Sequence, residues 1–191
     1  DGNMPIESFY PMTEKRRKKI LLVEDNPADR SMIRKLLESS AENCVIEVSE
    51  AEEALKFCDK VQIDGIVLDL HLPGMDGMEF LERLKSIYGG GVWPVVVLTG
   101  EGDETTAVEA MKRGAQDYLA KSGITQDKLL MSVASAASRA VEVRIQETEL
   151  QLLRAENERL KRAIADLDAR LSEAEGKLTD ALLKIQESTR L

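Results

Sequence analysis

The sequence predicts an α/β fold, in which a doubly wound sheet of five parallel strands is followed by one long helix. Short β-rich apolar runs alternate with helical patterns as far as about Lys121. Three of these runs are nearly continuous, which is typical of parallel strands covered on both faces. From about Thr125 onward there is no proline, the only glycine is Gly176, and helix-forming residues dominate. The chain therefore divides into a sheet-containing domain and a helical extension.

Each element of the first part has its own sequence signal. The expected strands are residues 20–23, 45–48, 66–68, 95–98 and 118–120. The first helix begins at Pro27, because Asn26 is placed to cap it and proline is favoured at the first helical position. Further helices are expected at residues 51–60, 78–87 and 103–113, and the last begins near Gln126.

Composition narrows the class of protein. The net charge of −9 argues against nucleic-acid binding through general electrostatics. The basic run at residues 15–19 is an exception, either a solvated lead-in to the first strand or a DNA-binding arm. Cys44 and Cys58 suit free thiols in a reducing cytoplasm better than a disulfide framework or a zinc site. Neither a membrane span nor a signal peptide is expected.

Polar residues gather where the predicted strands end. The first strand runs into Glu24 and Asp25, the third ends in Asp69, the fourth in Thr99, and the fifth in Lys121. In doubly wound sheets, ligands bind at the carboxyl ends of the strands, so these side chains should meet at one edge. Grouped carboxylates need a compensating cation, and a hard divalent ion such as Mg²⁺ is the natural partner. The alternative is a set of merely solvated strand ends.

These residues resemble the response-regulator receiver domains of two-component signalling. The matching motifs, in the order and spacing of that family, are residues 22–25 (LVED), 68–77 (LDLHLPGMDG), 97–100 (VLTG) and 114–121 (GAQDYLAK). The resemblance covers about residues 18–140. It implies a flavodoxin-like fold and phosphotransfer from a histidine kinase or phosphotransfer protein to an aspartate, here Asp69.

The resemblance also implies a role for each residue of the site. Asp25, Asp69 and the backbone carbonyl of His71 would ligate Mg²⁺, with Mn²⁺ as the alternative ion, and Glu24 would act mainly through metal-bound water. Lys121 and Mg²⁺ would neutralise the charge that develops on the phosphoryl oxygens. Thr99 would donate a hydrogen bond to the bound phosphoryl group. Such a domain assists only its own phosphotransfer and dephosphorylation, so it is not expected to be an enzyme acting on other substrates.

Three further residues have proposed secondary roles, and one position departs from the family. Tyr118 is either an aromatic packed on a strand end or, with Thr99, the switch that rotates on phosphorylation. His71 and Glu101 are expected to modulate access of water to the acyl phosphate. Where the family usually has proline after the lysine, joined by a cis peptide, this chain has Ser122. Either the cost of a non-proline cis bond, about 2.5–4 kcal/mol, is met, or this loop is trans and differently shaped.

A seven-residue apolar repeat follows the predicted domain. Its main positions are occupied by Leu150, Leu153, Asn157, Leu160, Ile164, Leu167, Leu171 and Leu178. A repeat sustained over several heptads indicates a coiled coil, and a lone asparagine at a core position favours a parallel two-stranded one. Opposite charges on the flanking positions agree with that orientation. The alternative, a helix packed back on the domain, would overshoot it at roughly 70 Å.

The expected organisation is a lead of residues 1–17, a receiver core of residues 18–124, and a long helix of residues 125–191 that becomes a homodimeric coiled coil from about residue 143. Residues 1–3 precede Met4 and are candidates for an expression remnant. The leading hypothesis is a receiver whose coil relays a signal to an output domain or partner beyond this chain. The chain stops within the heptads, which suits either truncation before an effector or a stand-alone protein. The competing hypotheses are a constitutive scaffold and a metal-dependent phosphatase.

Overall fold

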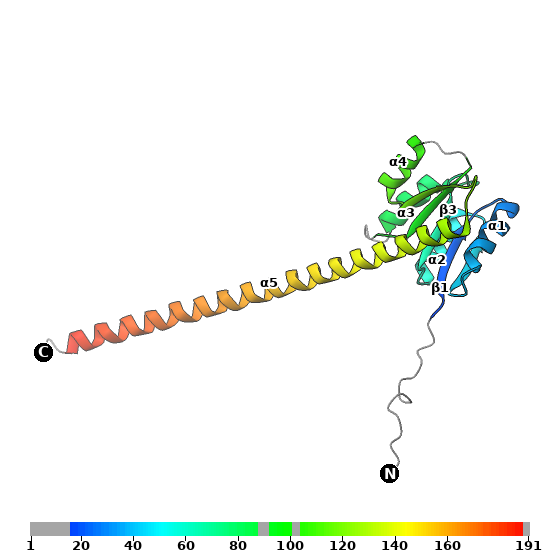
Figure 1. The fold of residues 1–191 in the computed structure, drawn as a ribbon. Coiled ribbons are helices and arrows are strands. Elements are labelled where there is room, and N and C mark those ends of the chain that lie inside the picture. The colour runs from blue at the N-terminus through cyan, green and yellow to red at the C-terminus, as the bar shows by residue number, and fades with distance from the viewer. Residues whose placement is uncertain (1–15, 88–91, 101–103, 189–191) are drawn as a thin grey trace, which may run out of the picture. The chain divides into compact units, whose positions relative to one another are not determined.

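Five parallel strands and five helices alternate along the chain in a computed structural model that describes residues 16–87, 92–100 and 104–188. The strands are β1 (Lys18–Val23), β2 (Asn43–Val48), β3 (Gly65–Asp69), β4 (Val95–Thr99) and β5 (Asp117–Ala120). The helices are α1 (Pro27–Glu38), α2 (Ala51–Lys60), α3 (Gly77–Ile87), α4 (Glu104–Arg113) and α5 (Gln126–Ser188). The predicted fold class is confirmed (Figure 1).

The order of the strands creates one switch point in the sheet. They lie in the order β2-β1-β3-β4-β5, and every neighbouring pair is parallel. The chain passes from β1 outward to β2 and then returns to the other side of β1 to form β3. The helices that follow β1 and β3 therefore leave on opposite faces, and a crevice opens between the carboxyl ends of these two strands.

Both faces of the sheet are buried, and alternate strand residues point to different helical layers. Leu21 and Val23 of β1 belong to the core under α2, α3 and α4, which also contains Phe80. Ile20 and Leu22 belong to the core under α1 and α5, which also contains Leu129. This arrangement explains why the strands read as continuous apolar runs instead of alternating patterns.

The cap of α1 sets the path of the chain as it leaves β1. The Asn26 side-chain oxygen accepts hydrogen bonds from the backbone N–H groups of Ala28 (2.9 Å) and Asp29 (3.3 Å). Pro27 follows at the first helical position, where its missing N–H costs nothing. The Arg30 guanidinium then donates to the backbone carbonyl of Glu24 at 2.7 Å. The loop that carries Glu24 and Asp25 is thus fixed at both ends.

The peptide between Lys121 and Ser122 is trans, since no described residue has a cis bond. Residues 121–124 form a turn in which the Ile124 N–H donates to the Lys121 carbonyl at 3.3 Å. Gly123 has a φ of 72° at the third position of this turn, where such a conformation favours glycine. This Ser-Gly turn takes the place of the cis-proline loop usual in the family and avoids a costly non-proline cis bond.

The chain divides into two compact units, residues 1–144 and 145–191, and α5 contributes residues to each. Within the first unit, Leu129, Val133, Ala136 and Ala140 are buried. Within the second, the described apolar side chains are exposed, as Leu150 and Leu160 are by 48% and 54%. None of the helices in the described residues is both long and apolar enough to cross a membrane.

Candidate functional site

Three carboxylates meet at the switch point between β1 and β3. Glu24 and Asp25 follow β1, and Asp69 is the last residue of β3. One oxygen from each lies within 4.8 Å of the others. Glu24 and Asp69 are buried, whereas Asp25 is exposed. The sequence placed these residues at the same sheet edge, and the structure brings them together.

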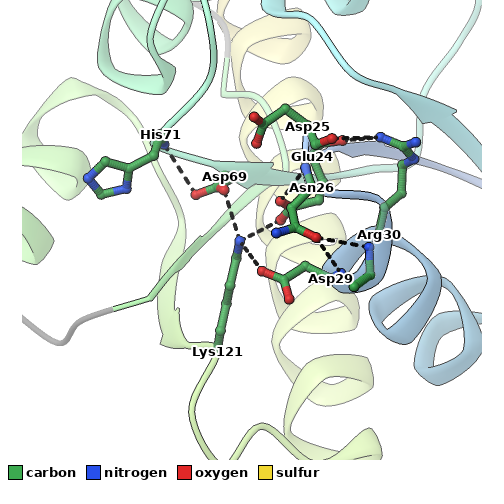
Figure 2. A network of polar contacts seen from close by, with 9 residues as sticks. Glu24, Asp25, Asn26, Asp29, Arg30, Asp69, His71 and Lys121 are labelled. Carbon is green, nitrogen blue, oxygen red and sulfur yellow. Dashed lines mark hydrogen bonds and ion pairs between the residues drawn. The ribbon is translucent and has the colours of Figure 1, made fainter.

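Lys121 supplies positive charge to this cluster from the end of β5. Its ammonium nitrogen lies 2.6 Å from Glu24 Oε2, 2.8 Å from Asp69 Oδ2 and 3.0 Å from Asp29 Oδ2. Figure 2 shows the lysine side chain reaching these three acids, which come from the β1 end, from β3 and from α1. A shape change caused by Ser122 therefore does not prevent Lys121 from reaching the site.

Asp29 is the member of this network that sequence reasoning did not assign to the site. It lies in the first turn of α1, where an acidic residue is common for helix stability alone. Its contact with Lys121 spans 92 positions in the sequence. The available signal was its location four positions after Asp25, in the first turn of α1, which starts at the carboxyl end of β1.

Burial and charge oppose one another at Glu24 and Lys121. The pKa of the Glu24 carboxyl is raised above its ordinary value of 4.5, mainly because the group is buried. The Lys121 hydrogen bond lowers this pKa, and the nearby charge of Asp69 raises it. Burial alone would lower the pKa of the Lys121 ammonium. Hydrogen bonds to Asp69, Glu24 and Asp29 outweigh that effect and raise it. Lys121 therefore stays charged, and the Glu24 carboxyl takes up a proton at a higher pH than an ordinary glutamate would.

Both oxygens of Asp69 have hydrogen-bond donors. Lys121 Nζ donates to Oδ2 at 2.8 Å, and the backbone N–H of His71 donates to Oδ1 at 3.2 Å. The residue is only 5% exposed, so these donors fix its orientation. The imidazole of His71 is directed away from the lysine in Figure 2, and the residue is exposed. In this structure His71 reaches Asp69 through its backbone.

Thr99 lies on β4, which pairs with β3, and Tyr118 lies on β5, the next strand beyond β4. Thr99 ends β4, is 2% exposed, and its carbonyl accepts a hydrogen bond from the Lys121 N–H at 2.8 Å. Tyr118 is on β5 and is half-buried against the core under α2, α3 and α4. Gly100 follows Thr99, and no described atom lies within 4 Å of where its Cβ would be. Glu101, a predicted modulatory residue, lies outside the described residues.

The sequence profile of the response regulator receiver domain matches residues 20–134. This chain belongs to that family. Receivers of two-component response regulators accept a phosphoryl group in an Mg²⁺-dependent reaction and interact with histidine kinases or phosphotransfer proteins. The aspartates, the lysine and the switch point described above lie within the matched region.

Curated relatives of this receiver include proteins with different outputs. RpfG of Xanthomonas campestris pv. campestris strain 8004, a cyclic di-GMP phosphodiesterase response regulator, is 30% identical over 153 residues, or 80% of this chain and 36% of RpfG. NarL of Escherichia coli K12, a nitrate/nitrite response regulator, is 35% identical over 122 residues, or 62% of this chain and 54% of NarL. The chain thus spans about half or less of the length of these relatives.

Solved receiver structures share the fold. A response regulator receiver domain protein from Clostridium thermocellum is 34% identical with a TM-score of 0.57, covering 64% of this chain and 95% of that one. The receiver domain of the sensor histidine kinase PA1611 from Pseudomonas aeruginosa PAO1 is 26% identical with a TM-score of 0.58, covering 64% and 98%. That structure has a magnesium ion coordinated in the active-site cleft.

The residues of the present receiver fit a magnesium ion. Carboxylate oxygens are the ligands that this hard cation prefers, and Glu24, Asp25 and Asp69 offer one each from a group less than 5 Å across. The exposure of Asp25 leaves this group open to solvent on one side, where water can complete the coordination. The acidic cluster is therefore chemically suited to the Mg²⁺ site of the family.

Proposed function

We propose that this receiver accepts a phosphoryl group on Asp69 from a histidine kinase or phosphotransfer protein, and relays the signal through a homodimeric coiled coil. The observation that carries the first part is the position of Asp69, buried at the switch point between two acidic residues and one lysine. Grouped buried carboxylates with a preformed cationic partner suit the binding of a metal and an anion in turn.

The transfer step assigns a task to each residue. A carboxylate oxygen of Asp69 attacks the phosphorus of a phosphohistidine, an oxygen–phosphorus bond forms, and the phosphorus–nitrogen bond breaks. The imidazole leaves with that electron pair and takes up a proton. Lys121 stabilises the negative charge on the phosphoryl oxygens. Asp25, Asp69 and the His71 carbonyl would hold Mg²⁺, or alternatively Mn²⁺, with Glu24 acting through water; the ion would neutralise charge on the same oxygens.

Readout within the receiver is assigned to Thr99 and Tyr118. Thr99 ends β4. It directly follows Leu98, which is the partner of Asp69 in the β3–β4 ladder. We expect its hydroxyl to donate to the phosphoryl group and the ring of Tyr118 to follow it inward. His71 and Glu101 are assigned modulatory roles in hydrolysis of the acyl phosphate. The receiver would thereby assist its own dephosphorylation without acting on other substrates.

The second unit is assigned to parallel dimerisation. Its exposed apolar residues repeat every seven positions, and we define the dimer seam as Leu150, Leu153, Asn157, Leu160, Ile164, Leu167, Leu171 and Leu178. Pairing two such helices would cover side chains that are about half exposed in one chain. The output that the coil serves lies in a further domain or partner. A cytoplasmic location, without nucleic acid or membrane as a partner, fits the net charge of −9.

The decisive experiment is incubation with acetyl phosphate and Mg²⁺ followed by intact mass measurement. We expect one phosphoryl group on the wild-type protein and none on Asp69→Asn. Asp59→Asn, an exposed change at the end of α2, is the matched control and should still be labelled. Absence of labelling with acetyl phosphate, phosphoramidate or a cognate kinase would instead support the constitutive scaffold.

A further inference from the structure

The Lys121 ammonium lies among three carboxylates in this structure. It donates hydrogen bonds to Asp69 Oδ2 and Asp29 Oδ2, and its contact with Glu24 Oε2 is an ion pair. An ammonium group has three donors, and the lysine contacts three carboxylates, those of Glu24, Asp29 and Asp69. A phosphoryl oxygen that arrives at Asp69 also requires one of these donors. An arriving phosphoryl oxygen therefore competes with the three acids that already surround the ammonium, and one of them must be released or share its donor.

The three contacts differ in how firmly they are held. The Glu24 and Asp69 side chains are 1% and 6% exposed, whereas that of Asp29 is 37% exposed. The Asp29 contact is also the longest, at 3.0 Å against 2.6 and 2.8 Å. A half-exposed carboxylate can be hydrated after release, whereas a buried one loses its partner without replacement. Asp29 is therefore the contact that yields most easily.

The backbone of Asp29 is fixed even though its side chain is accessible. Its N–H donates to Asn26 Oδ1 at 3.3 Å, and the next residue, Arg30, is tied to the Glu24 carbonyl at 2.7 Å. Figure 2 shows Asp29 and Arg30 side by side at the start of α1, with the Asp29 carboxylate turned toward the lysine. The backbone that carries this carboxylate is thus fixed, and from it the carboxylate accepts a hydrogen bond from Lys121 Nζ at 3.0 Å.

We propose that Asp29 is a positioning residue that occupies one donor of Lys121 in the resting receiver and is displaced from it by the phosphoryl group. The Asp29 carboxylate stands in for the phosphoryl anion until phosphorylation and competes with it afterwards. It therefore lowers the affinity of the site for phosphoryl oxygens and keeps the lysine directed into the site. This inference deepens the proposed function and rests on Asp69 being the acceptor.

The test is a calorimetric titration of the full chain with beryllofluoride, a tetrahedral phosphoryl mimic, at saturating Mg²⁺. Asp29→Asn removes the charge but keeps an oxygen acceptor, whereas Asp29→Ala removes both. We expect tighter binding in both variants, with Asp29→Ala the tighter, by about tenfold over wild type, because the competing acceptor is gone. The Kd for Mg²⁺ alone should rise in both variants, because the loss of a negative charge near the site weakens cation binding.

Glu38→Gln is the matched control for loss of charge. Glu38 is on the same helix, its side chain is also 37% exposed, and it pairs with Arg34 at 3.0 Å instead of with the site. Its Kd for beryllofluoride should equal that of wild type. Thermal unfolding of each variant without metal shows whether α1 remains folded.

The outcomes separate this inference from the proposed function. If the wild-type protein binds beryllofluoride but both Asp29 variants bind it equally to wild type, the inference is wrong and the proposed function stands. Equal gains in Asp29→Asn and Asp29→Ala would also overturn it, because charge alone would then explain the effect. A wild-type protein that does not bind the mimic at all would overturn both.

Discussion

Lys121 joins acidic residues that would otherwise repel one another, and the balance of charge at the site depends on it. Its ion pair with Glu24 is the most buried of its contacts, with side-chain exposures of 13% and 1%. Removing one member of a buried pair leaves the other charged and without compensation. The cost of losing the lysine should therefore fall mainly on Glu24.

We predict that Lys121→Met lowers the stability of the metal-free protein by about 3 kcal/mol at pH 7. The loss should shrink as the pH falls toward 5. Burial raises the pKa of Glu24 above 4.5 in the folded state, so the folded protein takes up a proton before the unfolded chain does. The stability gained from that proton is present at low pH and is lost as the pH rises through the folded pKa.

Urea unfolding at pH 7 and pH 5 measures this difference. The double variant Glu24→Gln, Lys121→Met provides the control, because without the Glu24 charge the loss at pH 7 should be smaller. If Lys121→Met were equally destabilised at both values, Glu24 would not be the group left uncompensated.

A second prediction at the residue scale concerns Mg²⁺. Binding to the folded state alone should raise its stability by about 2.7 kcal/mol when free Mg²⁺ is 100 times its Kd. Differential scanning calorimetry should show an increase in Tm with Mg²⁺ that Asp25→Asn removes. Because Asp25 is exposed, the variant should fold normally without metal. An unchanged Mg²⁺ response in Asp25→Asn would exclude that residue as a ligand.

At the scale of elements, Gly77 determines how closely α3 approaches the end of β3. A Cβ at this position would lie 2.6 Å from the Asp69 carbonyl oxygen and 2.7 Å from Leu70 Cα, both backbone atoms. Its own N–H donates to the Leu70 carbonyl at 3.0 Å. The absence of a side chain at Gly77 thus allows α3 to begin directly beside the proposed acceptor.

We predict that Gly77→Ala lowers the free energy of unfolding by about 1–3 kcal/mol, since backbone must move to admit the methyl group. It should also slow labelling by acetyl phosphate, because the strain falls on Asp69. Gly176→Ala is the contrasting control: nothing lies within 4 Å of a Cβ there, and alanine is the better helix former by about 1 kcal/mol. Urea unfolding of both variants measures these changes in stability. If Gly77→Ala were as stable as wild type, the close approach of α3 to β3 would be contradicted.

Most elements could be predicted from sequence because their signals are local. The apolar run of β3 and the Asn26-Pro27 start of α1 each identify an element without reference to the rest of the chain. Asp29 was not assigned to the site because its partner Lys121 is 92 positions away, and its acidic character was already explained by α1. The turn at Ser122 was left open, because only the folded loop shows that Gly123 makes a trans path available.

At the scale of the whole molecule, the proposed dimer depends on side chains that are exposed in one chain. Leu160 and Leu167 are 54% and 57% exposed. We predict that replacing both with lysine yields a monomer in analytical ultracentrifugation, because four ammonium groups would meet at the seam. The receiver should keep its ability to be labelled by acetyl phosphate.

Leu152→Lys is the matched control for this prediction. Leu152 is 67% exposed but falls outside the repeat that defines the seam, so the dimer should persist. Sedimentation of the wild-type protein as a monomer throughout the micromolar range would contradict the coiled coil. If it dimerises, spin labels along the coil, measured with and without beryllofluoride, would show whether phosphorylation is relayed into it.

Helix α5 also limits where another domain can be fused to this protein. Its first turns complete the core with Leu129, Val133 and Ala136, and the same helix continues to Ser188. A fusion made at the end of the sheet would cut through that core, whereas one made after Ala140 would preserve it. Each residue inserted or deleted at the junction rotates everything beyond it by about 100° around the helix axis. Grafts of new partners onto this receiver should therefore be tolerated in steps of seven residues.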